Sequence, residues 1–216
     1  MKRLSTYLLL SVALLSGCAP GAIDSEEALF AWMHNPDNGL SRQRSTAGLE
    51  VSFQYLPPAY LAWREATGME QCTPQQFDSL LALYNTGYTF IMTLGPDKEA
   101  GETFDVMYAG VHNEAEYNER VQQLNFQIGN YLQLKTAGGS YAPVLSRMEN
   151  TYGLASHRKI YLVFNTDNPN SDLFTAKELD LTFSDELFGT GISHYVFDRA
   201  QLTAEPELNL KKLLNG

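Results

Sequence analysis

Apolar residues recur every three or four positions in several segments of the chain, which is the spacing of one helix face. Capping-box pairs begin three of these segments, at residues 24–27, 73–76 and 113–116. Prolines stand at the first turn of two segments, where the missing N–H is tolerated. The pattern predicts helices over residues 24–34, 58–66, 74–84 and 114–135, and a short terminal helix over 208–214.

Other segments alternate between apolar and polar residues, the two-residue period of a strand with one buried face. Leu49 to Tyr55 is the clearest of them, and Ile160 to Phe164 is a continuous apolar run that favours a central strand. Turn-forming residues are concentrated at 165–172 and 189–191. The predicted strands cover residues 49–55, 88–94, 104–111, 141–148, 159–164, 179–183 and 192–197.

The expected helices and strands follow one another irregularly, which is typical of the α+β class. We expect a single domain over residues 24–216, with a mainly antiparallel sheet of about six or seven strands. The 114–135 segment would form a helix of roughly 33 Å, packed on one face of this sheet. Its apolar stripe also fits a coiled coil, but only for about two heptads.

The first residues have the layout of an export signal. Lys2 and Arg3 form a positively charged region, and Tyr7 to Leu15 form an apolar run interrupted only by Ser11. This run is too short for a stable transmembrane helix, which needs about 20 apolar residues. Residues 1–17 are therefore predicted to be a signal peptide that is removed after export.

Leu15-Ser16-Gly17-Cys18 resembles the lipobox of bacterial lipoproteins. The resemblance implies lipidation of Cys18 by a thioether, cleavage before it and acylation of the new amino terminus. Residues 18–23 would then be a lipidated cysteine with a short tether, and the membrane would be a partner through this lipid. The alternative is an ordinary secretory signal in which Cys18 falls at this place by chance.

In lipoproteins an aspartate directly after the cysteine favours the inner membrane, whereas this chain has Ala19 there. The resemblance therefore implies the outer membrane of the cell envelope, on its periplasmic or its surface side. Residues 35–40 and 55–57, and at most 181–197, resemble uncharacterised lipoproteins of Bacteroidota. The acidic residues 24–27 resemble a surface-export signal of such lipoproteins, but those signals lie closer to the cysteine. An acidic first turn of a helix is therefore the favoured interpretation.

Removal of Lys2 and Arg3 leaves 13 basic against 25 acidic residues, so the mature chain carries a formal charge of −12. Such a charge repels phosphates and argues against nucleic acid as a partner. If lipid occupies Cys18, Cys72 is the remaining cysteine, which excludes an intramolecular disulfide. Cys72 is then either a buried thiol or part of an intermolecular bridge.

Sequence motifs for catalysis are missing. The chain has no G-x-S-x-G, no H-E-x-x-H and no G-x-x-x-x-G-K-[ST], so neither a catalytic residue nor a cofactor is assigned. The four histidines His34, His112, His157 and His194 are scattered, with Asp198 the nearest acidic residue to His194, and no metal site is expected. Residues 167–172 are rich in oxygen ligands for calcium, but their composition equally fits a turn.

Four aromatic residues of the first third of the domain are candidate ligand-binding residues, namely Trp32, Tyr55, Tyr60 and Trp63. Together they would form a platform for a glycan or peptide, although such spacing also fits core positions. Three functions remain open. The leading one is a non-enzymatic, lipid-anchored binding or assembly component with an envelope protein partner, and the others are a carboxylate-based hydrolase or glycan-processing enzyme and a small-ligand or glycan binder.

Overall fold

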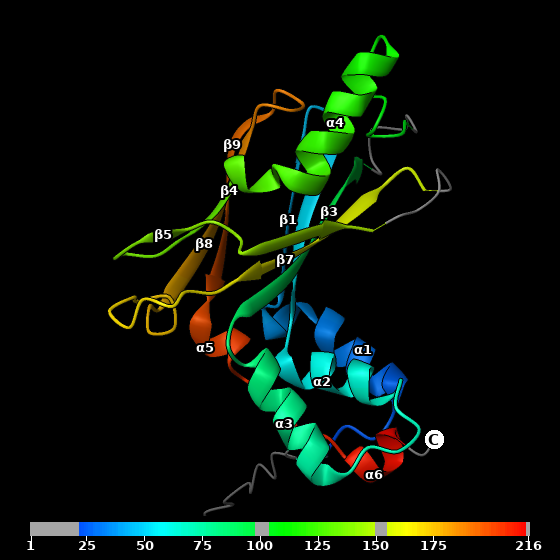
Figure 1. The fold of residues 1–216 in the computed structure, drawn as a ribbon, viewed down its shortest axis with the longest axis vertical. Helices are drawn as coiled ribbons and strands as arrows, with labels where there is room; N and C mark the ends of the chain where they lie inside the picture. The colour runs from blue at the N-terminus through cyan, green and yellow to red at the C-terminus, as the bar shows by residue number, and fades with distance from the viewer. Residues whose placement is uncertain (1–21, 98–103, 150–154, 215–216) are drawn as a thin grey trace, which may run out of the picture.

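A computed structural model describes residues 22–97, 104–149 and 155–214 of the chain. Its strands form two antiparallel sheets, a five-stranded sheet of order β1-β2-β3-β7-β6 and a four-stranded sheet of order β5-β4-β8-β9 (Figure 1). The α+β class and the antiparallel pairing expected from the sequence are confirmed. The strands are β1 (Ser41–Thr46), β2 (Leu49–Leu56), β3 (Tyr88–Pro96), β4 (Leu132–Lys135), β5 (Ser140–Tyr141), β6 (Leu145–Met148), β7 (Arg158–Phe164), β8 (Glu178–Asp185) and β9 (Gly191–Asp198).

The main core lies between the inner faces of the two sheets. Alternate residues of each strand point inward, as the two-residue period requires. The ring of Phe53 packs 4.7 Å from that of Tyr195, and Phe90 packs 5.2 Å from Phe197, with both distances between ring centroids. Beside them Arg42 of β1 donates from Nε to the carbonyl oxygen of Val196 on β9 at 2.7 Å, so the two sheets are joined along this margin.

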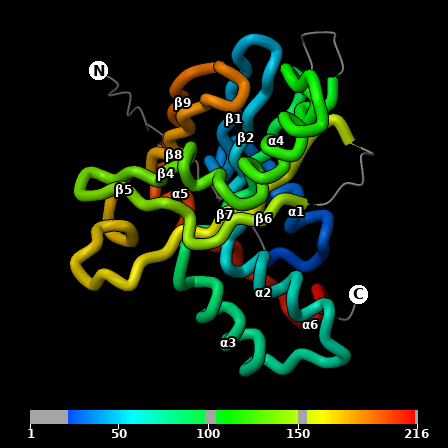
Figure 2. The backbone as a smooth tube through the Cα atoms, turned by 45° about the horizontal axis from the view of Figure 1, so that its top comes forward, coloured from blue at the N-terminus to red at the C-terminus, as the bar shows by residue number. Residues whose placement is uncertain are grey.

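Helices cover the two ends of the sandwich. α4 (Glu114–Phe126) lies across one end beside β6 and buries Leu124 in the main core (Figures 1 and 2). Four helices at the other end surround a second, smaller core with Trp63 and Phe77 at its centre. These are α1 (Glu26–His34), α2 (Pro58–Ala66), α3 (Pro74–Tyr84) and α6 (Leu210–Leu213), while α5 (Arg199–Leu202) directly follows β9.

The chain enters the fold at this helical end. Ile23 forms a parallel bridge with Leu208, donating from its backbone N–H to Glu207 and accepting from Asn209, each at 2.7 Å. Lys212 of α6 donates to the carboxylate of Asp24 at 2.6 Å. Ile23, which the sequence assigned to the tether, is therefore already part of the folded structure.

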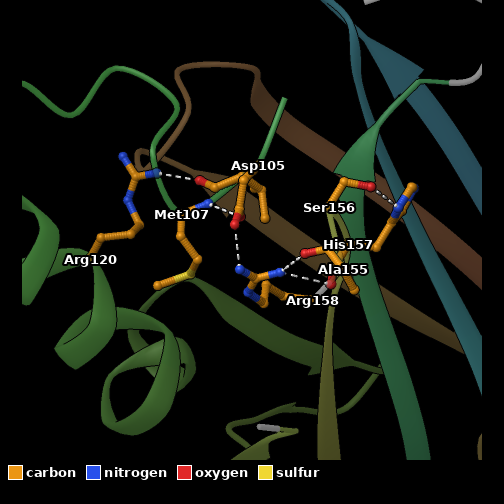
Figure 3. Close-up of polar contacts among 8 residues, drawn as sticks. Asp105, Met107, Arg120, Ala155, Ser156, His157 and Arg158 are labelled. Carbon is orange, nitrogen blue, oxygen red and sulfur yellow. Dashed lines mark hydrogen bonds and ion pairs between the residues drawn. The ribbon is translucent and has the colours of Figure 1, made fainter. Parts of the chain in front are cut away.

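The predicted strand over residues 104–111 is wrong. This segment forms turns, in which Gly110 has a φ of 67° and Asp105 accepts from the backbone N–H of Met107 at 2.9 Å. The other oxygen of Asp105 pairs with the guanidinium of Arg158 at 2.7 Å (Figure 3). Val106 and Met107 of this segment are buried although they lie in turns. Their burial explains why the hydrophobic pattern resembled that of a strand.

The predicted helix over residues 114–135 ends early. α4 stops at Phe126, a 3₁₀ turn spans Ile128–Asn130, and β4 begins at Leu132. In β4, Leu132 and Leu134 are buried at the two-residue period of a strand. Leu132 also lies four residues after Ile128, a spacing that fits one face of a helix. The strand pairing with β8 decides between the two patterns.

Two further differences concern short strands. The predicted strand over 141–148 is divided around Pro143 into β5 and β6, which lie in different sheets, because proline cannot donate to a ladder. β1 was missed since its sequence, Ser-Arg-Gln-Arg-Ser-Thr, lacks apolar residues and five of its six residues are exposed. Within the described ranges, no helix has both the length and the apolar composition needed to cross a membrane.

Candidate functional site

A cavity of about 490 Å³ opens where the sandwich meets the helical end of the molecule. Its wall comes from the end of β2, the α3–β3 connection, the segment after Leu173 and the chain that follows α5. We call this cavity the Tyr55 pocket. It is lined by Tyr55, Pro58, Asn85, Gly87, Tyr88, Phe174, Leu202, Thr203 and Glu205.

The backbone brings two tyrosines together at the floor of the Tyr55 pocket. Tyr55 is paired with Phe90 in the β2–β3 ladder, and Tyr88, two residues earlier on β3, lies on the same face. Their ring centroids are 6.1 Å apart. Gly87, directly before Tyr88, permits the close approach of the end of β7, because a Cβ there would lie only 2.7 Å from the carbonyl oxygen of Phe164.

The hydroxyl of Tyr55 is the most informative group in the pocket. The residue is only 3% exposed as a whole, but its hydroxyl is not a buried atom and makes no hydrogen bond with a described residue, so it is open to the cavity. Burial raises the pKa of Tyr55 well above its ordinary value, so the hydroxyl is neutral at physiological pH. A ligand in the cavity can therefore reach this hydroxyl and form a hydrogen bond with it.

Glu205 lines the Tyr55 pocket and is an exposed residue. Its partial burial raises the pKa of its carboxyl group, and no described residue donates to that group. It is also the single charged side chain among the described lining residues. The carboxylate is therefore partly desolvated and uncompensated.

Phe174 forms an aromatic wall of the pocket. Its ring is 38% exposed and stacks on Tyr88 at 5.6 Å with an angle of 25° between the planes. Burial raises the pKa of Tyr88, and the positive charge of Arg199 partly opposes this effect. Arg199 itself lines a neighbouring groove rather than the Tyr55 pocket.

Of the four aromatic candidates from the sequence, Tyr55 alone lines this pocket. Trp63 is buried in the smaller core, where its indole Nε1 donates to the carbonyl oxygen of Leu213 at 3.4 Å. Tyr60 packs 6.0 Å from Trp63, and half-buried Trp32 packs against the main core. The structure therefore does not bring the four together as one platform, because three of them serve to pack helices.

The remaining pocket residues carried weak signals in the sequence. Tyr88 lies in an alternating strand pattern, which predicts a core position. Phe174 and Glu205 lie in polar segments without periodicity. Their meeting depends on β3, the loop before β8 and the chain after α5, which are distant in sequence. A partial signal existed, since Tyr55 lies near the end of the clearest strand, one residue before two prolines.

Residues 167–172 form a turn, as their composition suggested, and Asp172 is fully occupied by protein donors. Its carboxylate accepts from the hydroxyls of Thr136 at 2.6 Å and Tyr141 at 2.9 Å and from the backbone N–H of Gly138 at 2.8 Å. These bonds, above all that from Thr136, lower the pKa of Asp172. Asp167 is exposed and makes no contact with them.

The histidines have separate environments. His194 pairs with Asp180 at 2.7 Å, not with Asp198 as its position in the sequence suggested, because the β8–β9 register brings the two side chains together. His34 bonds to the carbonyl oxygen of Phe30 at 2.8 Å. Over the ranges that the structure describes, no three His, Cys, Asp or Glu residues are grouped as a metal site would need.

Of the two cysteines, Cys72 is among the residues that the structure describes. Cys18 and the predicted signal peptide lie outside the described residues. Cys72 is a free thiol in this single chain, and it is half-buried, not fully buried. It lines a second cavity of about 570 Å³ between α2, α3 and α6, whose wall includes Met69, Phe77 and Leu214.

No family model matches this chain. No curated protein matches it either. Among solved structures, a crystal structure of a protein of unknown function from Burkholderia pseudomallei K96243 is similar over 80% of this chain and 83% of that one, at 12% sequence identity. The TM-score of 0.32 is too low for an argument about fold or function.

Proposed function

We propose that this protein is a lipid-anchored, non-enzymatic binding protein of the bacterial cell envelope, whose domain holds a small ligand in the Tyr55 pocket. The anchor part of the proposal is supported by the lipobox resemblance at Cys18, and Ala19 favours the outer membrane. The binding part is supported by the geometry of the pocket. No step of chemistry is assigned to the protein.

One observation carries the binding function, namely the Tyr55 hydroxyl, which lines the cavity without a hydrogen-bond partner among the described residues. Small-molecule sites typically combine apolar walls with a few polar groups that orient the ligand. The hydroxyl lines a cavity of about 490 Å³, within the usual range for small-molecule sites. A binding pocket explains both features together.

A variant that fills the pocket tests this function. Thr203 is exposed and lines the Tyr55 pocket, so Thr203→Trp should occupy the cavity and leave the fold intact. Ser79→Trp on the exposed side of α3 adds the same ring outside the pocket. In ligand-observed NMR with a library of small fragments, we expect hits on the wild type and on Ser79→Trp, with at least tenfold fewer on Thr203→Trp. Equal hit rates for all three proteins would contradict the proposal.

A protein partner is the second candidate, favoured by the outer surface of β9. Ile192 and Val196 are 66% and 44% exposed, and with His194 between them they share one face of this strand. Exposed apolar side chains in a row are typical of contact surfaces. Cross-linking in intact cells would test it, and an Ile192→Asp variant with an unchanged cross-linking pattern would count against it.

The carboxylate-based enzyme has less support. Glu178 and Asp198 are opposite each other in the β8–β9 register, so two acidic groups do lie close together. However, Asp198 accepts from the backbone N–H of Ala200 at 2.8 Å and thereby caps α5. This structural role accounts for its position without a catalytic one.

A further inference from the structure

We propose that the ligand of the Tyr55 pocket is a protonated organic amine, with its ammonium group placed between the Glu205 carboxylate, the Tyr55 hydroxyl and the Phe174 ring. This inference rests on the proposed binding function and adds the chemical class of the ligand. It follows from the charge, the hydrogen-bonding groups and the apolar surface of the cavity.

The charge of the pocket lining favours a cationic ligand. Glu205 is the single charged residue among the described residues that line the pocket, and no described donor neutralises its carboxylate. An anionic ligand would meet this charge at short range in a partly desolvated site, where Coulomb interactions are strong. Arg199 acts electrostatically on Tyr88, but it lines a different groove.

The hydrogen-bonding groups match an ammonium donor. A protonated primary amine has three N–H donors and no acceptor. The ionised Glu205 carboxylate accepts hydrogen bonds only, and the Tyr55 hydroxyl oxygen can accept one more. Because the hydroxyl of Tyr55 has no partner in the described protein, its accepting capacity is free for a ligand.

The aromatic wall adds a third contact suited to a cation. Phe174 is fixed by its stacking on Tyr88, and part of its ring surface stays accessible. A cation within about 6 Å of a ring face is attracted by the negative potential of the π system. Pro58 and Leu202 complete the lining with apolar surface for the hydrocarbon part of the amine.

A neutral sugar is the main competing ligand, since it would also stack on Phe174 and donate to Glu205. The two classes differ in their need for charge. A sugar hydroxyl can bond to a glutamine amide in place of a carboxylate, whereas an ammonium group loses its counter-charge when the carboxylate is removed. The Glu205→Gln substitution therefore separates them.

The test uses the full mature lipoprotein in an uncharged polyoxyethylene detergent, titrated at pH 7 with cyclohexylammonium, cyclohexanol or glucose and followed by protein NMR. We expect cyclohexylammonium to shift the signals of Asn85 and Tyr88 and to bind at least tenfold more tightly than cyclohexanol, which has the same shape without the charge. Glu205→Gln should weaken its binding at least tenfold, and Tyr55→Phe about threefold to tenfold.

Glu207→Gln is the matched control, because Glu207 is an exposed carboxylate two residues away that does not line the pocket. It should bind cyclohexylammonium like the wild type. If cyclohexanol or glucose bound as tightly as cyclohexylammonium, and Glu205→Gln changed nothing, the pocket would be a binding site but the amine class would be wrong. If none of the three probes shifted the signals of the pocket, the amine ligand and the proposed binding function would both be overturned.

Discussion

At the scale of single residues, Glu205 is placed where the fold disfavours its charge. Because burial raises the pKa of its carboxyl group above the unfolded value, the stability that it contributes is complete at low pH and is lost as the pH rises through the folded pKa. Glu205→Gln should therefore stabilise the free protein at pH 7 by about half a kcal/mol, a value kept small by solvent screening. This corresponds to a rise in Tm of roughly 1–2 °C.

Calorimetry at pH 7 and at a pH below the ordinary pKa of glutamate would measure this effect. The stabilisation should disappear in acid, where both states are protonated. Glu207→Gln should leave Tm unchanged at both pH values. A Glu205→Gln variant that was less stable than the wild type at pH 7 would show that the carboxylate has a stabilising partner. A group that weakens the fold but is needed for a ligand fits the usual trade-off between stability and function.

Only part of the candidate site could be predicted from residues in sequence. Tyr55 was a candidate as one of four aromatic residues in the first third of the domain, but a pattern of alternation cannot show whether its hydroxyl faces a cavity. The cavity also needs Glu205 and Phe174, which reach the pocket from segments more than a hundred residues away. For Trp63 the sequence left two alternatives, a surface platform and a core position. The structure places it in the smaller core.

At the scale of elements, the Asp105–Arg158 ion pair fixes the turn segment after residue 104 to the start of β7. The side chain of Arg158 is 6% exposed, and its Nη1 donates to the carbonyl oxygens of Ala155 and His157. Asp105→Asn would leave a buried guanidinium without a counter-charge, which costs about 3 kcal/mol. Asp105 also accepts a hydrogen bond from the backbone N–H of Met107, so we expect the substitution to weaken the turn.

Chemical denaturation and hydrogen exchange would measure these two effects. We expect a loss of about 3 kcal/mol in the free energy of unfolding and faster exchange at Met107. Asp78→Asn on the exposed side of α3 should change neither, because this carboxylate has no such partner. A loss for Asp105→Asn no larger than that for Asp78→Asn would mean that the ion pair contributes little.

Elements with local signals were predictable, and those that depend on distant partners were not. The start of α3 is determined locally, because Thr73 and Gln76 cap each other through hydrogen bonds of 3.3 Å and 2.8 Å. β1 has no such signal, since its polar edge strand exists only through its ladder with β2 and its contacts with β9. The helix-to-strand change before Leu132 likewise depends on pairing with β8.

At the scale of the whole molecule, the position of the first described residues determines how the proposed anchor would hold the domain. Ile23 and Leu208 pair at the helical end, and α4 lies at the far end of the sandwich (Figure 1). Cys18 is only five residues before Ile23, a span of at most about 18 Å. A lipid on Cys18 would therefore keep the helical end next to the membrane and the outer ends of the sheets away from it.

Replacement of the lipidated cysteine tests this arrangement. Cys18→Ser removes the thiol that would carry the lipid, and it lies outside the contacts that begin at Ile23, so the fold should be unchanged. Each buried methylene of an acyl chain contributes about 0.8 kcal/mol to membrane binding, so the wild type should resist a high-salt wash and the variant should be released. Cys72→Ser is the matched control and should stay membrane-bound, because Cys72 is a thiol of the folded domain. Mass spectrometry of the wild-type amino-terminal peptide should show the added lipid. A Cys18→Ser protein that remained in the membrane fraction after the wash would exclude lipid on this residue as the anchor.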